Sequence, residues 1–481
     1  MRIRANYGTI PRRHGMKEGF YAMDMITTRE LKERLAELQG QQVSLQGWIR
    51  NHRKQKNMGF IDFFDGTCFR NPQVVYDNAI ADFEKIQAFH VGSAVRVTGK
   101  VVPSYKDPET PEIQAAEITL EGDCPEDYPL QPKKHSLEFL REIAYLRPRT
   151  RLFQAVFRVR SVAAMAIHTY FQDRGYVYVH TPLITANDAE GAGNTFTVTT
   201  LPLGEKPDFS QDFFGKQTAL AVSGQLEGET FAMAFSNIYT FGPTFRAENS
   251  NTKTHAAEFW MIEPEMAFCD LNGLMEIEED FLKSIVKYVL DRCPDELKFL
   301  DGFTGGGLLD KLTALTESSF ARVTHEEAIT ILRKAMENGT EFQFTPEYGG
   351  DTAKEHEKYL TEEYFHSPVL VYDWPKEIKS FYMYQNEDGK TVRGVDLLVP
   401  GAGELMGGSQ REDRLDRLTA RMDELGISKE TMDWYVNLRK YGGCTHSGFG
   451  MGFERLLIYL TGVENIRDVI PYFRTPMNCD F

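Results

Sequence analysis

The chain contains 481 residues, enough for about two to four domains, and its 42% apolar and 26% charged residues are typical of a soluble globular protein. Its 54 Lys and Arg against 70 Asp and Glu give a net charge of −16. This balance excludes a protein that coats nucleic acid or membranes by bulk charge, although it leaves room for a local basic groove.

The N-terminal residues 1–26 are predicted to be an extension outside the folded domains. Only basic charges precede Glu18, but the segment lacks the Ser content and clear amphipathic pattern of a transit peptide. We interpret it as a flexible extension, or as a start site assigned upstream of Met23 or Met25. The six cysteines form no C-x-x-C pair and no run approaches the ~18 apolar residues of a membrane span, so we expect a cytoplasmic protein with reduced thiols and no membrane partner.

Residues 27–122 are predicted to form a small β-barrel domain. A short helical pattern at 31–38 is followed by strand patterns between Gly, Asp and Pro residues. The predicted strands are 43–49, 60–63, 74–76, 95–101 and 113–118. Three prolines then make residues 123–135 a stiff linker to a large domain, 136–481.

The large domain opens with an amphipathic helix, in which apolar residues recur at three- and four-residue steps from Leu152 to Tyr170. Gly175 stands where a C-terminal cap belongs, and a strand is predicted at 176–180 before Thr181-Pro182. Residues 290–367 are acidic and mixed, with helical patterns and a Gly-rich piece, and we interpret them as an insertion.

Two strand patterns bracket a polar loop at residues 249–257, which is longer than an ordinary hairpin connection. Arg246 leaves the first strand and can make a bidentate contact to a phosphate, which His255 in the loop could also meet. Phe259 on the return strand offers a flat face to a purine. The alternative is a plain hairpin in which Arg246 and Glu248 form cross-strand pairs.

The run Ser447-Gly-Phe-Gly-Met-Gly-Phe-Glu-Arg455 places glycines at alternate strand positions, where a flat ligand can approach the backbone closely. Arg455 then falls at the start of an apolar helix, where it can face an anion. The spacing is neither the dinucleotide fingerprint nor a P-loop. The alternative is a glycine-kinked core strand.

Between these runs, Asp396 and Glu404 lie on a predicted strand and its neighbour and could hold Mg²⁺, a hard cation that bridges phosphates. They could equally be surface carboxylates, one of them paired to an arginine. Ser223, Gln225, Glu229 and Glu190 place polar groups beside apolar strands, where they could bind a small zwitterion or only satisfy backbone groups.

Together these runs resemble the three motifs of class II aminoacyl-tRNA synthetases. Phe-Arg246-x-Glu248 with its loop resembles motif 2, Gly-x-Gly-x-Gly-x-Glu-Arg455 resembles motif 3, and the helix ending at Gly175 resembles motif 1. The N-terminal barrel is similar to the OB-fold of the aspartyl, asparaginyl and lysyl subclass. Three segments resemble the bacterial asparaginyl members: 132–141, 407–412 and 465–471. The resemblance implies an α+β fold, with an antiparallel sheet flanked by helices beside an OB-fold barrel.

The resemblance also implies an ATP site with Mg²⁺. Arg246 would contact the α-phosphate, Arg455 and His255 the γ-phosphate, and Glu248 would orient the adenine on Phe259. Catalysis would rest on Arg246, Arg455 and Glu404. The full implied set for ATP is Arg246, Glu248, His255, Phe259, Gly450, Gly452 and Arg455. Glu404 and Asp396 would hold the metal, although an extra residue between them makes Asp396 the less secure ligand.

The implied amino-acid site is Glu190, Ser223, Gln225, Glu229 and Arg411. Glu190 and Gln225 would receive the α-ammonium, and Arg411 the side-chain carbonyl. Glu229, or alternatively Glu227, would accept the side-chain amide N–H. Aspartyl members carry Lys and His where this chain has Gly228 and Asp413, and an added carboxylate would repel aspartate. Such a site rejects an analogue that leaves buried groups unpaired.

The implied reaction has two steps: asparagine attacks ATP to give asparaginyl-adenylate and pyrophosphate, and the 3′-terminal adenosine of tRNA(Asn) then receives the amino acid. The resemblance implies a homodimer formed through the motif 1 helix and strand. In the barrel, a basic run at 50–56 precedes Phe60, and we expect Arg50 and Phe60 to contact the anticodon.

Three other functions fit parts of the pattern. A relaxed aspartyl-tRNA synthetase is disfavoured by Glu229, Gly228 and Asp413. A non-catalytic RNA-binding paralogue is disfavoured because Arg246 and Arg455 are both present. A tRNA-independent amide-forming enzyme would lack the barrel.

Overall fold

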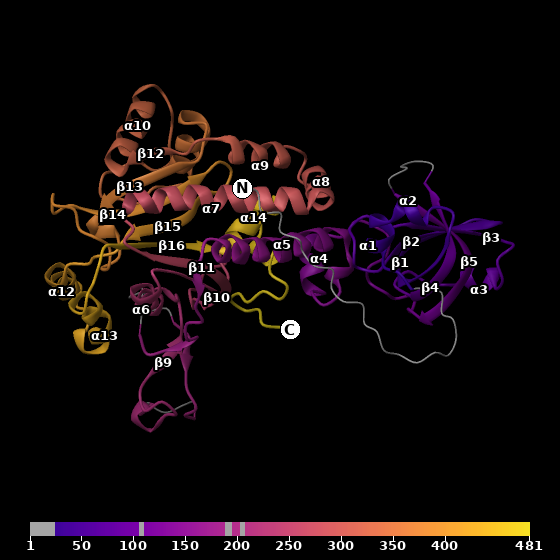
Figure 1. Ribbon diagram of the computed structural model, residues 1–481, viewed down its shortest axis with the longest axis horizontal. Helices are drawn as coiled ribbons and strands as arrows, with labels where there is room; N and C mark the ends of the chain where they lie inside the picture. Colours follow the sequence, from indigo (N-terminus) through magenta and orange to yellow (C-terminus); the bar gives the residue numbers. More distant parts are fainter. Residues whose placement is uncertain (1–24, 105–109, 188–194, 203–206) are drawn as a thin grey trace, which may run out of the picture. The chain divides into compact units, whose positions relative to one another are not determined.

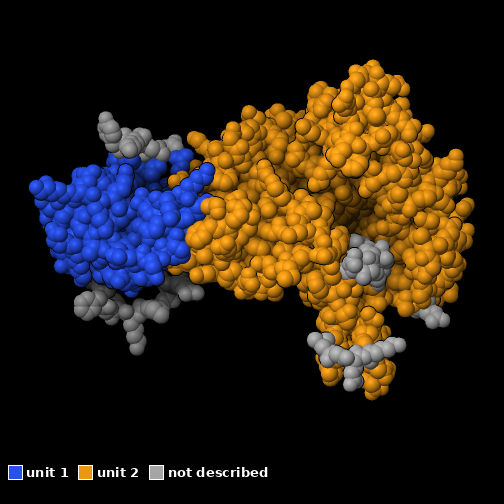
Figure 2. All heavy atoms as spheres, turned by 180° about the vertical axis from the view of Figure 1, so that it is seen from behind, with its two compact units in different colours: residues 1–135 blue, residues 136–481 orange. Residues whose placement is uncertain are grey.

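The computed structural model describes residues 25–104, 110–187, 195–202 and 207–481. The chain divides into two compact units, residues 1–135 and residues 136–481 (Figure 2). Most of the predicted N-terminal extension and the candidate Glu190 lie outside the described residues.

Unit 1 is a closed five-stranded barrel with the strand order β1-β2-β3-β5-β4 (Figure 1), as predicted. Each predicted strand lies within one of the five. The elements of this unit are α1 (Thr28–Glu33), α2 (Leu35–Leu38), β1 (Gln42–Lys54), β2 (Met58–Phe64), β3 (Gln73–Asp77), α3 (Phe83–Gln87), β4 (Ala94–Pro103) and β5 (Pro111–Gly122).

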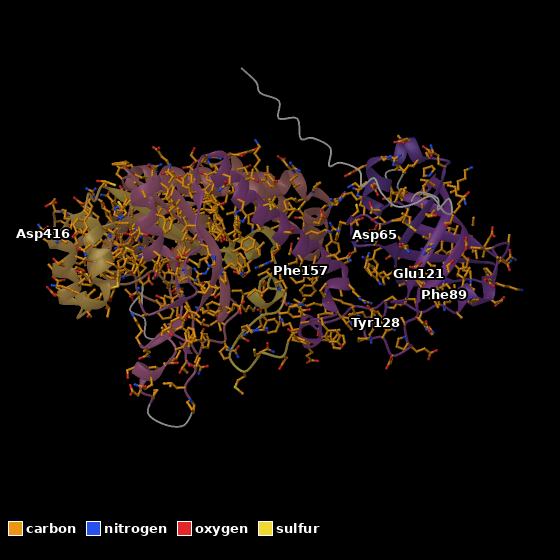
Figure 3. The ribbon with its side chains drawn as sticks, turned by 60° about the horizontal axis from the view of Figure 1, so that its bottom comes forward. Asp65, Phe89, Glu121, Tyr128, Phe157 and Asp416 are labelled. Atoms are coloured by element: carbon orange, nitrogen blue, oxygen red, sulfur yellow. The ribbon has the colours of Figure 1, made fainter. Side chains whose placement is uncertain are left out.

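Alternation along β2 builds the barrel. Ile61 and Phe63 are fully buried in its core, whereas Phe60 between them is only partly buried. The predicted helix at 31–38 is two short helices that meet at Arg34, whose backbone leaves helical geometry. The carboxylate of Asp65, labelled in Figure 3, accepts the backbone N–H of Thr28 at 2.7 Å and thereby ties α1 to the end of β2.

Unit 2 is built on an eight-stranded sheet with the order β12-β13-β14-β15-β16-β11-β10-β6. The neighbouring strands from β13 to β10 are antiparallel, and β12 and β6 join the two edges in parallel. A small sheet of β7, β9 and β8 lies apart. The strands are β6 (Val177–Tyr178), β7 (Ile184–Thr185), β8 (Thr197–Val198), β9 (Thr218–Leu220), β10 (Asn237–Phe245), β11 (Glu258–Ala267), β12 (Ala321–Thr324), β13 (Val369–Pro375), β14 (Thr391–Val399), β15 (Gly403–Gln410) and β16 (His446–Gly452).

Helices flank this sheet, so the predicted α+β class is confirmed (Figure 1). Helix α7 packs on β14, β15 and β16, and α5 packs on α7. The α-helices are α4 (Leu137–Glu142), α5 (Arg151–Asp173), α6 (Gln225–Phe235), α7 (Leu271–Arg292), α8 (Pro294–Phe303), α9 (Leu308–Glu317), α10 (His325–Glu337), α11 (Lys354–Lys358), α12 (Leu415–Glu424), α13 (Lys429–Lys440) and α14 (Phe453–Thr461). Short helical turns lie at 147–149, 209–211, 359–364, 376–378 and 466–468. Within the described residues, no helix is long and apolar enough to cross a membrane.

Helix α5 is the predicted amphipathic helix. Thr150 caps its start by accepting the N–H of Phe153, and Gly175 follows its end with a positive φ of 77°. The predicted strand at 176–180 is shorter, because only Val177 and Tyr178 pair with β10. The predicted insertion, 290–367, contributes β12 to the sheet edge, so part of it belongs to the central layer.

Candidate active site

Strands β10 and β11 hold Arg246 above Phe259. The backbone N–H of Arg246 donates to the carbonyl of Ala257 at 2.9 Å, which closes the connection just beyond the last strand pair. The Arg246 guanidinium carbon lies 5.5 Å from the centroid of the Phe259 ring. The connecting loop is therefore residues 246–257, longer than the predicted polar segment because β10 ends at Phe245.

The C-terminal segment fixes this loop. The N–H of Ile466 donates to Lys253 O at 2.8 Å, and the N–H of Ala257 donates to Arg474 O at 2.7 Å. Arg467 Nη1 donates to Thr252 O at 3.2 Å. These bonds tether the loop to residues distant in the chain, unlike the loop of a free hairpin.

The two segments that the bacterial resemblance singled out, 132–141 and 465–471, meet in the structure. Arg141 forms a bidentate pair with Asp468 at 2.9 and 2.5 Å. The fully buried Arg147 lies 3.5 Å from the same carboxylate and donates to the carbonyl of Ile470 at 2.6 Å. This charged cluster fixes the segment that in turn holds the loop.

The glycine-rich run forms β16, and Arg455 lies in the first turn of α14, as predicted. Its Nη1 is 3.4 Å from Glu404 Oε2 on β15. The neighbouring Glu454 is buried, pairs with Arg160 at 2.8 Å and accepts the N–H of Trp260 at 2.9 Å. Glu454 therefore locks the turn that presents Arg455.

All seven residues expected to bind ATP line one cavity of about 260 Å³, which we call the nucleotide cavity. A second cavity of about 270 Å³, the amino-acid cavity, adjoins it. Arg246, Met261, Glu404 and Gly450 line both, so the two form one continuous space. Ser223, Gln225, Asp396 and Arg411 line the amino-acid cavity.

Asp396 and Glu404 are brought together beside Gly407. A Cβ at Gly407 would lie 3.4 Å from Asp396 Oδ1 and 3.5 Å from Glu404 Oε1. Two carboxylates at one rim fit a hydrated Mg²⁺, which takes one or two protein carboxylates and keeps its waters for phosphate oxygens. Asp396 also accepts from Lys379 Nζ at 2.6 Å, while burial raises the pKa of Asp396 to about 6 against the opposing effect of Lys379. Within the described part of the chain, no cluster of three or more ligating side chains occurs.

Arg411 and Glu265 form a buried pair at the floor of the amino-acid cavity. Arg411 Nε donates to Glu265 Oε2 at 3.1 Å, Nη2 donates to Glu265 Oε1, and Nη1 donates to Ser409 Oγ at 2.8 Å. A guanidinium has five N–H donors, so two remain for a ligand. Burial raises the pKa of Glu265 to about 7, although Arg411 acts in the opposite direction.

Glu229 does not line either cavity, which departs from its expected role as a direct amide acceptor. It is fully buried and accepts from Gln225 Nε2 at 3.1 Å, Tyr435 OH at 2.9 Å, Arg439 Nη2 at 2.9 Å and His446 Nε2 at 3.0 Å. Burial alone would raise its pKa, but Arg439 and His446 outweigh burial and hold the pKa of Glu229 below its ordinary value. Its oxygens are thus occupied by protein donors, and Gln225 stands between Glu229 and the cavity.

Ser223 and Gln225 are placed by the start of α6. Ser223 Oγ donates to Glu263 Oε1, and the N–H of Gly224 donates to Glu263 Oε2 at 3.0 Å. The alternative Glu227 also lies outside both cavities, and burial raises its pKa.

Sequence reasoning missed four residues of this site: Glu263, Glu265, Lys379 and Arg439. Glu263 and Glu265 occupy alternate positions of β11, so both carboxylates lie on one face of that strand. This spacing was the signal that could have identified them. Nothing local marks Lys379 or Arg439, because their partners lie on other elements.

In the barrel, the predicted anticodon residues lie in different environments. Phe60 is partly buried, and the guanidinium of the exposed Arg53 lies 5.2 Å from its ring centroid. Arg50 packs over Phe64 at 4.4 Å and lies 3.9 Å from Asp62, with its side chain only 15% exposed. Phe60 with Arg53 therefore offers the more accessible stacking surface.

Comparisons with known proteins identify both units. A family described as "tRNA synthetases class II (D, K and N)" matches residues 136–476, and the "OB-fold nucleic acid binding domain" family matches residues 43–121. The chain is 57% identical over 464 residues to an asparagine–tRNA ligase of Acholeplasma laidlawii, covering 95% of this chain and 100% of the relative. It is 53% identical over 466 residues to that of Clostridium perfringens, with the same coverages. The asparaginyl-tRNA synthetase of Pyrococcus horikoshii complexed with asparaginyl-adenylate superposes with a TM-score of 0.82 at 30% identity, covering 95% of this chain and 100% of that chain.

Proposed function

The chain belongs to the class II tRNA synthetases of the D, K and N group, and we propose that it is an asparagine–tRNA ligase that activates asparagine with ATP and transfers it to tRNA(Asn). The observation that carries the amino-acid assignment is the 57% identity to an asparagine–tRNA ligase along that protein's whole length. The continuous nucleotide and amino-acid cavities support this proposal, because ATP and asparagine bound in them would meet at the residues that line both.

In the first step, a carboxylate oxygen of asparagine attacks the α-phosphorus of ATP, and the bond to the β-phosphate breaks as pyrophosphate leaves. Arg246 lies at the junction of the two cavities and stabilises charge on the α-phosphate. Phe259 stacks on the adenine, Glu248 orients it, and Arg455 with His255 holds the γ-phosphate. Mg²⁺ at Glu404 and Asp396 would neutralise phosphate charge when bound.

Asparagine selection rests on the floor of the amino-acid cavity. The two remaining donors of Arg411 meet the side-chain carbonyl, while the paired carboxylate of Glu265 and the charge of Glu229 disfavour a second negative group. Glu229 can accept the amide N–H of asparagine only if Gln225 gives up its hydrogen bond to Glu229 Oε1. Gln225 and Glu190 receive the α-ammonium, and Ser223 stays with Glu263.

In the second step, the 3′-hydroxyl of the terminal adenosine attacks the activated carbonyl and AMP leaves. Phe60 stacks on an anticodon base beside Arg53, whereas Arg50 packs on Phe64 and stabilises the barrel surface. A homodimer through α5 and β6 is supported by the exposed edge strand, on which Val177 and Tyr178 are 36% and 47% exposed. We propose that it acts in the cytoplasm, because charged tRNA is used there in translation.

Aminoacylation of transcribed tRNA tests this function. Labelled asparagine should be attached to a tRNA(Asn) transcript, whereas labelled aspartate and an anticodon-substituted transcript should give at most a small fraction of that rate. Attachment of aspartate to tRNA(Asn) at a similar rate would contradict the proposed specificity.

A further inference from the structure

A third cavity of about 690 Å³, larger than the nucleotide and amino-acid cavities, adjoins the nucleotide cavity. It has no role in the reaction described so far. Thr254, Glu404, Leu405 and Arg455 line both, so the two spaces are continuous at Arg455. A group released beside Arg455 can therefore enter this space directly. We call it the lysine cavity, after Lys311, Lys354 and Lys358 in its wall.

Lys311, on α9, is held in place by Tyr459. Its Nζ donates to the Tyr459 carbonyl at 3.2 Å and lies 4.2 Å from the centroid of that ring. One bond leaves two of its three N–H donors for a ligand. Burial lowers the pKa of Lys311 to about 8, so the amine is still largely protonated at neutral pH.

Lys354 and Lys358 lie one turn apart on α11, on the same face of that helix. Both are exposed, and neither side chain makes a hydrogen bond or ion pair within the described residues. Their positive charges are thus available to an anion in the cavity.

The carboxylates in the same wall have other partners. Glu464 pairs with Lys253 at 2.6 Å, and Glu362 accepts the N–H of Gly401 at 2.9 Å. Glu357 accepts the N–H of Glu404 at 3.1 Å. The fourth carboxylate, Glu404, lies 3.4 Å from Arg455. Each acidic group of the wall thus has a partner in the protein, whereas none of the three lysines has a carboxylate partner within the described residues.

We propose that the lysine cavity binds inorganic pyrophosphate after it leaves ATP, so that Lys311, Lys354 and Lys358 form a product site beyond Arg455. This inference rests on the proposed function, because the reaction must release pyrophosphate. A compact polyanion matches the chemistry of the wall. An RNA backbone is the less suitable occupant, because the cavity opens on the nucleotide cavity, where pyrophosphate is formed.

Steady-state ATP–pyrophosphate exchange with the full chain tests the site. In the double variant Lys354→Ala/Lys358→Ala, the KM for pyrophosphate should rise about five-fold, since two exposed charge contacts are lost. The KM for ATP and for asparagine should stay within about two-fold, and Lys311→Met should act in the same direction. The matched control is Lys298→Ala/Lys334→Ala. This variant removes two exposed lysines that also lie within residues 290–367 but line none of the three cavities.

An unchanged KM for pyrophosphate would overturn the inference. A parallel rise in the KM for ATP would also overturn it, because the lysines would then contact bound ATP, and a rise confined to the KM for tRNA would assign them to RNA. Calorimetric titration of pyrophosphate with Mg²⁺ into the wild type and the double variant tests the site without turnover. A wild type that binds pyrophosphate but shows no exchange with asparagine would refute the proposed function and leave the site standing.

Discussion

Arg439→Met removes the principal cation beside the fully buried carboxylate of Glu229. The two groups are 2.9 Å apart, with side chains 1% and 0% exposed. In wild-type protein Arg439 and His446 keep the pKa of Glu229 below its ordinary value, so the carboxylate is ionised at pH 5.5 and at pH 7. Without Arg439, an uncompensated buried carboxylate is left, which typically costs about 3–5 kcal/mol.

The structure sets a pH dependence for this cost. A buried carboxylate that has lost its principal cation takes up a proton. Starting from the ordinary pKa of 4.5, protonation costs about 1.36 kcal/mol for each pH unit above that value, or about 3.4 kcal/mol at pH 7 and about 1.4 at pH 5.5. The destabilisation of Arg439→Met should therefore fall by about 2 kcal/mol between pH 7 and pH 5.5.

The direction of this pH dependence follows from the number of protons that the folded and unfolded states bind. In the variant, the folded state binds one more proton than the unfolded state above pH 4.5, so its stability falls as the pH rises. Arg439 also donates to the carbonyl of Glu412 at 2.8 Å, and losing that bond adds about 1 kcal/mol at either pH. The free energy of unfolding is measured by urea titration at pH 5.5 and pH 7 for both proteins.

Arg439→Lys is the matched control, because it keeps the charge and loses the planar fork. Its loss of stability should be nearly the same at the two pH values. A destabilisation of Arg439→Met that is equal at pH 5.5 and pH 7 would refute an ionised Glu229 paired to Arg439. An equally steep pH dependence in Arg439→Lys would do the same.

Three further predictions concern the nucleotide cavity, the barrel and the lysine cavity. Arg246→Ala should lower the exchange rate by at least about 100-fold with unchanged thermal stability, and retained activity would remove Arg246 from the ATP site. Phe60→Ala should raise the KM for tRNA about ten-fold in aminoacylation while leaving exchange unchanged, and an unaltered KM would exclude stacking on Phe60. Lys311→Met should be more stable than wild type at pH 7, because burial lowers the pKa of Lys311 to about 8 and so destabilises the charged folded state. Urea titration should show this difference in the free energy of unfolding shrinking by about 2 kcal/mol by pH 10. A difference that does not change with pH would contradict the burial of this charge.

The barrel and the ATP residues could be predicted because their signals are local. Alternation at 43–49 and 60–63 reflects one buried face per strand, and that pattern survives in any context that closes the barrel. Arg246 and Arg455 each adjoin a strand end, so their positions follow from the chain around them.

The amino-acid floor could not be predicted in the same way. Glu229 and Arg439 are far apart in the chain, and tertiary packing alone decides that they pair. The role expected of Glu229 took no account of Gln225, Tyr435 and His446, which fill its oxygens. Likewise, four residues of β12 carry too short a pattern to reveal a strand inside a segment with helical signals.

The central claim is that this chain activates asparagine, and ATP–pyrophosphate exchange with asparagine, aspartate and lysine supplied separately tests it most directly. Purified full-length protein with Mg²⁺ should incorporate labelled pyrophosphate into ATP with asparagine alone, and Arg246→Ala should not. Exchange driven by aspartate would contradict the assignment of Arg411, Glu265 and Glu229 to amide selection. Absence of exchange with all three amino acids would contradict the claim that this chain activates an amino acid.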